Sequence, residues 1–336
     1  MLVDVAALVL AIALVVYVLT GGADYGGGVW VLLASGSRAR QQRALIEKVL
    51  APIWEANHVW LIVVVVVLFA CFPPAFAAVT TALHIPLTLF LVGVVLRGSA
   101  FVFRHYGMEG AAGRRRWSRV FAGASVVTPV MLGVCAGALS TGTIRVQDGL
   151  VTSGFFAGWT GPFAGVVGLL TLALCAQLAA VYLAVEAEAS GLPALRDDFA
   201  VRGILATAVT GGLALVAALL SRGGAPGLWE ELTGSFGAVI GLPAGAVAAV
   251  ATVLALHRRD VRRARLAVGA QTVLLLGGWA AALHPHALRP DLTLAEAAAP
   301  TEVLAVTLGI LGLGAVFLLP ALAWLFRVFE GAAGER

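Results

Sequence analysis

Long apolar runs of about twenty residues, separated by short polar connections, repeat along the whole chain. A bilayer core about 30 Å thick needs roughly 20 helical residues, so each run predicts a membrane-spanning helix. Barrel strands would show short alternating segments instead. We predict nine helices that form one all-α, polytopic membrane domain over residues 1–336. The predicted spans are Leu2–Thr20, Ala56–Phe72, His84–Phe103, Val120–Ser140, Phe163–Val185, Ile204–Leu220, Ala238–Leu256, Leu266–Leu283 and Val303–Phe326.

Composition supports the membrane class and excludes several others. Hydrophobic residues make up 60% of the chain and charged residues 12%, and the mean hydropathy is +0.98. Soluble domains have about 45–50% apolar and about 25% charged residues, so a soluble enzyme, a disordered chain and a disulfide scaffold are excluded. The pI of about 9.3 comes from arginines between apolar runs rather than from one basic face, which argues against nucleic-acid binding. Three isolated cysteines, without a C-x-x-C pair, predict no zinc or iron–sulfur site.

The distribution of basic residues predicts the orientation. When the connections are assigned alternately to the two sides, 18 of the 22 lysines and arginines fall on one side and three on the other, with Arg97 inside a span. Because basic residues favour the cytoplasmic side, we predict that the N-terminus lies outside and the C-terminus in the cytoplasm. The connections are short, and the longest outside one, His284–Glu302, could hold a small amphipathic piece at most.

The first polar group inside apolar sequence is the stretch Thr20–Gly28, in which five glycines surround Asp24. Ionisable groups at membrane depth are costly, so Asp24 is a functional candidate. We expect it at or just within the cytoplasmic boundary. The alternative is a glycine-rich helix end with an interfacial aspartate.

The second polar group is the stretch Ala51–Leu61. Pro52 suits a first helical turn, and Pro73 marks the far end. Glu55 lies 18 residues before Pro73, which corresponds to about 27 Å of helix, so we expect it at the cytoplasmic mouth of the span. Spacing places His58 on the same face one turn further in, with Trp54 beside it. A carboxylate and an imidazole there suit proton uptake. The alternative is a carboxylate favoured by the helix dipole and a histidine that donates to a carbonyl.

Three further polar residues inside spans suggest contacts between helices. Arg97 is expected either to pair with Asp24 or Glu55, which lie at similar depth, or to extend its side chain towards the membrane–water interface. Gln177 and Gln271 are candidates for a hydrogen bond between helices.

The remaining polar candidates favour structural roles. His84 is expected to be a packing residue rather than a haem ligand. Glu186 and Glu188 are interpreted as the solvated end of a span. His284 and His286 are a weak metal candidate, because Pro285 separates them and they lie in an outside loop.

Both polar stretches resemble subunit II of cytochrome bd-type terminal oxidases, the quinol oxidase family that includes cyanide-insensitive members. The similar segments read T-G-G-A-D-Y-G-G-G at Thr20–Gly28 and A-P-I-W-E-A-N-H-V-W-L-I at Ala51–Ile62. The second segment, with Asn57 and Trp60, is the specific one. Shorter similarities lie at Leu96–Gly98, Gly161–Phe163, Tyr182–Leu183 and Pro290–Thr293. Family members have nine spans, as counted here.

The resemblance implies a heterodimer with a subunit I that carries haems b and d, oxidises quinol and reduces dioxygen to water. This chain would carry no haem, metal or catalytic residue. It would stabilise subunit I, and in some members of the family this subunit also lines a cytoplasmic proton path to the oxygen-reducing haem. Glu55 matches the family's acidic entry position and Asp24 its second carboxylate, with His58 as a further path candidate. Arg97, Asn57, Trp54 and Trp60 are the structural or ion-pair candidates. The family's first acid in the glycine motif is Gly21 here, so any role of that acid is absent or relocated.

Further expectations come with the resemblance. The chain is placed in a bacterial or archaeal cytoplasmic membrane, with lipid and small single-span accessory subunits as further partner candidates. Some members hold a structural quinone in this subunit, but no residue pattern here indicates a quinone site. Two rival functions are a secondary transporter, marked by paired broken helices at mid-membrane, and a scaffold without a proton role.

Overall fold

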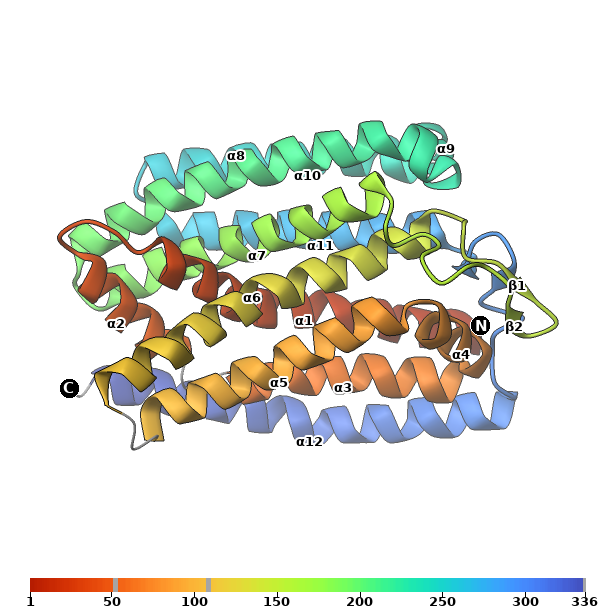
Figure 1. Ribbon diagram of the computed structural model, residues 1–336, viewed down its shortest axis with the longest axis horizontal. Helices are drawn as coiled ribbons and strands as arrows, with labels where there is room; N and C mark the ends of the chain where they lie inside the picture. Colours follow the sequence, from red (N-terminus) through yellow and green to blue (C-terminus); the bar gives the residue numbers. More distant parts are fainter. Residues whose placement is uncertain (51–53, 107–109, 335–336) are drawn as a thin grey trace.

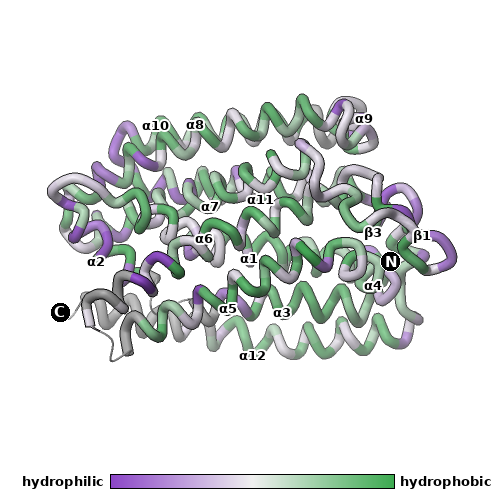
Figure 2. The backbone as a smooth tube through the Cα atoms, in the orientation of Figure 1, coloured by the Kyte–Doolittle hydropathy of each residue, from purple (hydrophilic) through white to green (hydrophobic). Residues whose placement is uncertain are grey.

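The protein is a bundle of long helices that run along one axis (Figure 1). The computed structural model describes residues 1–50, 54–106 and 110–334, and these residues form 12 helices and two small hairpins. Apolar residues cover the length of the helices, whereas hydrophilic residues gather at both ends of the bundle (Figure 2). A bilayer-spanning bundle requires this distribution, because lipid solvates apolar side chains and water solvates the ends.

Eight helices of the described chain are long and apolar enough to cross a membrane. They are α1 (Leu2–Leu33), α5 (His84–Tyr106), α6 (Ala111–Ser140), α7 (Pro162–Ala189), α8 (Pro193–Gly224), α10 (Phe236–His257), α11 (Val261–Leu283) and α12 (Thr301–Gly334). A ninth crossing is formed if α3 (Trp54–Cys71) and α4 (Pro73–Ala82) count as one span, bent by 117°. Pro73 and Pro74 explain the break, since proline fits the first turn of a new helix and ends the preceding one. The all-α polytopic fold is thereby confirmed.

Helix α1 is much longer than predicted. The predicted end at Thr20 is wrong, because the helix continues through the glycine stretch to Leu33. The glycines allow other helices to approach closely. A Cβ on Gly26 would lie 1.9 Å from the Cys175 carbonyl oxygen of α7, and one on Gly28 would lie 2.2 Å from the Ser125 Cβ of α6. Tertiary packing therefore compensates the low helix propensity of glycine.

Helix α7 lies at the centre of the bundle, packed against α1, α6, α8 and α11. Helix α12 lies along one edge against α3 and α1, and α8 and α10 form the opposite edge (Figure 1). The N-terminus and the end of α12 lie at opposite ends of the bundle, as an odd number of crossings requires (Figure 1).

Short elements close the ends. Helix α2 (Ala39–Leu50) follows α1, and α9 (Pro226–Gly234) follows α8. Strands β1 (Val146–Gln147) and β2 (Leu150–Val151) pair with Val146 opposite Val151. Strands β3 (His286–Leu288) and β4 (Leu292–Thr293) form a second hairpin, where the sequence predicted at most an amphipathic piece. Asp148 and Gly149 have φ of 50° and 76°, and Asp-Gly is the typical two-residue turn for a hairpin.

A surface ion pair joins the two hairpin connections. Arg145 donates to both carboxylate oxygens of Asp291, at 2.7 and 2.8 Å, and the Val146 backbone N–H donates to the same carboxylate at 2.9 Å. The Arg145 guanidinium holds the pKa of Asp291 below its ordinary value, and the Val146 hydrogen bond lowers this pKa further.

We expect this contact to make stability acid-sensitive. Since the pKa of Asp291 is lowered in the folded state, its contribution is fully present above the ordinary carboxyl pKa of the unfolded chain. It is lost as the pH falls through the folded pKa. Melting temperatures from pH 7 down to about pH 3 should fall less steeply for Asp291→Asn than for the natural sequence. Asp148→Asn, in the same region, is the control and should follow the natural sequence; equal acid sensitivity of all three would contradict the prediction.

A buried ion pair as the candidate functional site

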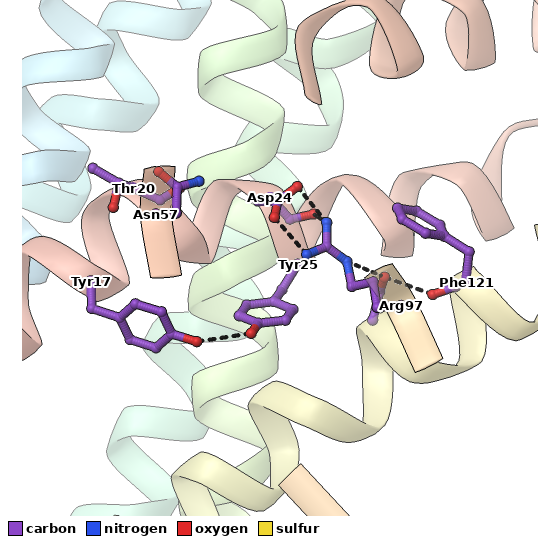
Figure 3. Close-up of polar contacts among 8 residues, drawn as sticks. Tyr17, Thr20, Asp24, Tyr25, Asn57, Arg97 and Phe121 are labelled. Atoms are coloured by element: carbon purple, nitrogen blue, oxygen red, sulfur yellow. Dashed lines mark hydrogen bonds and ion pairs between the residues drawn. The ribbon is translucent and has the colours of Figure 1, made fainter. Parts of the chain in front are cut away.

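A buried salt bridge between α1 and α5 is the centre of the candidate site (Figure 3). The side chains of Asp24 and Arg97 are each 4% exposed. Both terminal nitrogens of Arg97 donate to the Asp24 carboxylate, and Nη2 also donates to the Asp24 backbone carbonyl at 3.1 Å. Arg97 Nε donates to Ser125 Oγ of α6 at 3.0 Å, and Ser125 in turn donates to the Phe121 carbonyl at 2.7 Å. One guanidinium therefore links three helices.

Aromatic rings enclose the guanidinium. Arg97 lies 4.9 Å from the ring centre of Tyr25 and 5.0 Å from that of Phe121, distances typical of cation–π contacts. The Tyr25 hydroxyl shares a 2.8 Å hydrogen bond with the Tyr17 hydroxyl two turns earlier on α1. The Tyr17 ring packs edge-on against the His58 ring of α3, with centroids 6.4 Å apart.

The contacts of Arg97 favour a buried pair of opposite charges over a single buried charge. A single charge in a low-dielectric interior is expensive, whereas a bidentate pair with further hydrogen bonds is tolerated. Four donor contacts of Arg97 are directed at Asp24 and Ser125, which leaves the guanidinium little freedom to reorient. The arrangement suits a permanent anchor between α1, α5 and α6. Arg97 therefore does not extend towards the membrane–water interface. It pairs with Asp24, one of its two predicted carboxylate partners.

Protein surrounds the Asp24 side chain on all sides. Helix α1 continues for nine residues beyond Asp24, and the carboxylate is enclosed within the bundle. Its expected position at or just within the cytoplasmic boundary stays a prediction. The glycines around it bring α6 and α7 against α1, so the carboxylate is covered by protein. Trp30 adds a further contact in this region by donating to the Ala176 carbonyl of α7 at 2.8 Å.

The second motif meets the first at the start of α3. Buried Asn57 donates to the Thr20 carbonyl of α1 at 3.3 Å, and Trp60 packs in the cluster that contains Tyr17 and Tyr25. A Cβ on Gly21 would lie 3.8 Å from the Asn57 Cβ, so Gly21 faces this junction. The two stretches that carry the family resemblance are therefore neighbours in space.

Part of the second motif lies outside the described residues. Trp54 and Glu55 belong to the first turn of α3, but their side chains, like residues 51–53, are not among those described. The position of the Glu55 carboxylate at the mouth of the span, and its shared face with His58, stay predictions.

The other polar candidates make structural contacts. Gln177 Nε2 donates to Gln271 Oε1 at 2.8 Å, which joins α7 to α11. His84 places Nδ1 2.8 Å from the Thr81 carbonyl oxygen and packs its ring edge-on against Phe155. At the end of α7, Glu186 lies 3.6 Å from Lys48 and Glu188 lies 3.6 Å from Arg196.

Within the described ranges, no group of three or more histidine, cysteine or acidic side chains could hold a metal ion. The cysteines Cys71, Cys135 and Cys175 are buried and free. His286 lies in β3, and the His284 ring lies 3.9 Å from Asp4.

Three residues of the site were not predicted from the sequence: Tyr17, Tyr25 and Ser125. The spacing of the tyrosines was an available signal, because residues eight apart on a helix share a face. Ser125 gave no comparable signal, since its partner is 28 residues away on another helix.

Comparison with known proteins places the chain in a family. The family model described as cytochrome bd terminal oxidase subunit II matches residues 2–329. The chain is 29% identical over 180 residues to the cytochrome bd-I ubiquinol oxidase subunit 2 of Escherichia coli K12, covering 52% of this chain and 46% of that protein. It is 26% identical over 193 residues to the putative cytochrome bd menaquinol oxidase subunit II of Bacillus subtilis 168, covering 56% and 54%. The chain thus spans about half the length of the curated relatives it matches.

The fold extends over the whole chain. The structure of bd oxidase from Geobacillus thermodenitrificans superposes with a TM-score of 0.75 and covers 98% of this chain and 99% of that one, at 22% identity. At that identity the likeness establishes the fold, and the family model establishes the membership. This multi-pass membrane protein belongs to the cytochrome bd terminal oxidase subunit II family.

Proposed function

We propose that this chain is the non-haem subunit of a bd-type quinol oxidase in a bacterial cytoplasmic membrane. It packs against a haem-bearing subunit I, which reduces dioxygen to water, and stabilises that partner. The family match over residues 2–329 carries the proposal, and the fold likeness over 98% of the chain supports it.

The described histidines fit a chain without haem. A haem iron needs an axial ligand such as a histidine nitrogen. His58 lies against the Tyr17 ring, and His84 Nδ1 lies beside the Thr81 carbonyl. His257 is exposed at the end of α10, and His284 and His286 lie near an end of the bundle. We assign haems b and d to the partner because of the family match.

A transporter is disfavoured by the continuity of α1. Secondary transporters bind substrate at paired broken helices near mid-membrane. The glycine stretch is helical throughout. Among the described residues, the bend between α3 and α4 lies near one end of the bundle rather than at its middle (Figure 1).

We further propose that Glu55 and Asp24 have different roles. Glu55 takes up protons at the cytoplasmic mouth, with His58 as the next group inward. Asp24 anchors Arg97, because both of its carboxylate oxygens are engaged by that guanidinium. Proton uptake from the cytoplasm requires the arginine-rich end of the bundle to face the cytoplasm and the N-terminus to lie outside. The excess of lysine and arginine in the connections on that side favours the same orientation.

Oxygen uptake tests the proposed function. The chain is co-expressed with a candidate subunit I from the same organism, and the complex is isolated through a tag on this chain. We expect the isolated complex to consume oxygen when a quinol is supplied. A tagged chain that brings down no haem protein, or a complex without quinol-dependent uptake, would overturn the proposal.

Glu55→Gln tests the proton path. We expect oxygen consumption per haem to fall severalfold while haem content stays unchanged, because the amide has no titratable proton. Glu55→Asp is the matched control and should keep much of the rate, since a carboxylate of similar intrinsic pKa remains. An unchanged rate per haem in Glu55→Gln would remove the proton-entry role. Loss of haem in proportion to activity would indicate a structural role instead.

A further inference from the structure

The turn between α10 and α11 concentrates positive charge at one end of the bundle. Five arginines lie within eight residues, and all are exposed to solvent: Arg258, Arg259, Arg262, Arg263 and Arg265. The carboxylates that face them are Asp260 in the turn and Asp197 at the start of α8. The local balance is strongly positive.

Internal contacts engage only some of these arginines. Arg259 pairs with Asp197 at 3.2 Å, Arg263 pairs with Asp260 at 3.3 Å, and Arg265 lies 5.4 Å from the Tyr182 ring centre. Within residues 1–50, 54–106 and 110–334, neither Arg258 nor Arg262 forms a salt bridge. Two guanidinium groups are thus available to an external anion.

The turn that presents them is well defined. The Asp260 backbone N–H donates to the Ala255 carbonyl at 2.9 Å, and the Asp260 side chain accepts the Arg263 backbone N–H at 3.0 Å as the N-cap of α11. Val261 and Ala264 are buried beneath the turn. The arginines therefore project from a fixed scaffold.

A stripe of exposed aliphatic residues leads to Arg258 along α10. Val247, Val250 and Leu254 are 67%, 58% and 49% exposed. Their spacing of three and four residues places them on one face, and Arg258 continues that face one turn later. Val247 and Arg258 are 11 residues apart, about 16 Å of helix, which matches the roughly 15 Å of one leaflet's hydrocarbon. On α11, Leu266 is 75% exposed and follows Arg262 by one turn.

We propose that the α10–α11 turn binds an anionic phospholipid. Arg258 and Arg262 hold the phosphate of the headgroup, and an acyl chain lies along Val247, Val250 and Leu254. A free phosphate would use the arginines but not the stripe, whereas a lipid uses both, and the length of the stripe equals one leaflet. All residues of the proposed lipid site belong to this chain, so the proposal does not depend on the proposed oxidase function.

Native mass spectrometry tests the site on the full chain, extracted in detergent with whatever partner accompanies it. Phosphatidylglycerol and phosphatidylcholine with identical acyl chains are added separately. We expect phosphatidylglycerol to bind about tenfold more tightly, since two exposed arginines at the same end of the bundle favour the anionic headgroup. The double variant Arg258→Gln/Arg262→Gln should lose this preference. Arg222→Gln is the control and should keep it, because this exposed arginine lies near the opposite end of the bundle against Trp229.

Three results would overturn the proposal. The first is equal binding of both lipids by the natural sequence, which would mean that the arginines do not recognise an anionic headgroup. The second is an unchanged preference in the double variant, which would mean that the anionic lipid binds elsewhere. The third is displacement of the bound lipid by millimolar inorganic phosphate, which would indicate a site for a free anion.

Discussion

Asp24→Asn should nearly abolish recovery of the folded chain, because it leaves Arg97 buried and charged without a counterion. Removal of one partner from a buried pair costs about 3–5 kcal/mol, a large fraction of the stability of a typical protein. The amide can still accept a hydrogen bond from Arg97, so the missing charge is the expected cause. The yield of monodisperse protein in detergent, and its melting temperature, measure the effect.

A double variant separates charge from packing. Asp24→Leu/Arg97→Met removes both charges and keeps apolar volume between α1 and α5. It should recover much of the yield lost in Asp24→Asn, since apolar replacements of buried pairs are often neutral. Asp198→Asn, which breaks the exposed contact with Arg38, should have little effect. If Asp24→Asn is as stable as the natural sequence, the ion pair is not the anchor described here.

Gly26→Ala should be the other severely destabilising change. The new Cβ would lie 1.9 Å from the Cys175 carbonyl oxygen and 2.4 Å from its carbonyl carbon, so α1 and α7 would have to move apart. Overpacking typically lowers the stability of the folded protein by about 1–3 kcal/mol. Because this clash is with the backbone of the central helix α7, we expect a loss of about 3 kcal/mol or more. Thermal unfolding in detergent measures the loss.

Gly165→Ala on α7 is the matched control for Gly26→Ala. A Cβ at Gly165 meets no atom within 4 Å, so only helix propensity changes. Alanine should therefore raise stability by about 0.5–1 kcal/mol. If Gly26→Ala and Gly165→Ala behave alike, close packing does not explain the glycine stretch.

The membrane fold could be predicted because hydropathy and helix length are local properties of the sequence. Apolar runs set the crossings, and Pro73-Pro74 marked the break between α3 and α4. The length of α1 could not be read in this way, because clustered glycines have low helix propensity and suggest a boundary. Only the presence of α6 and α7 against Gly26 and Gly28 explains why the helix continues.

The candidate site could be predicted only in part. Asp24 and Arg97 were recognisable as charges inside apolar sequence, but depth alone did not distinguish Asp24 from Glu55 as the partner. That choice depends on how α1, α5 and α6 pack, and Ser125 and Tyr25 complete the contact from positions that look ordinary in sequence. The β1–β2 hairpin was not predicted, although Asp-Gly, here Asp148-Gly149, is a typical two-residue hairpin turn.

Haem quantification tests the central claim, that this chain is the haem-free partner of a haem-bearing subunit. The complex isolated through a tag on this chain is separated into its subunits under conditions that retain bound haem. Pyridine haemochrome spectra are then recorded for each fraction against its polypeptide concentration. The account predicts haem in the complex and in the partner fraction, and none with this chain. Haem in stoichiometric amount with this chain would contradict it.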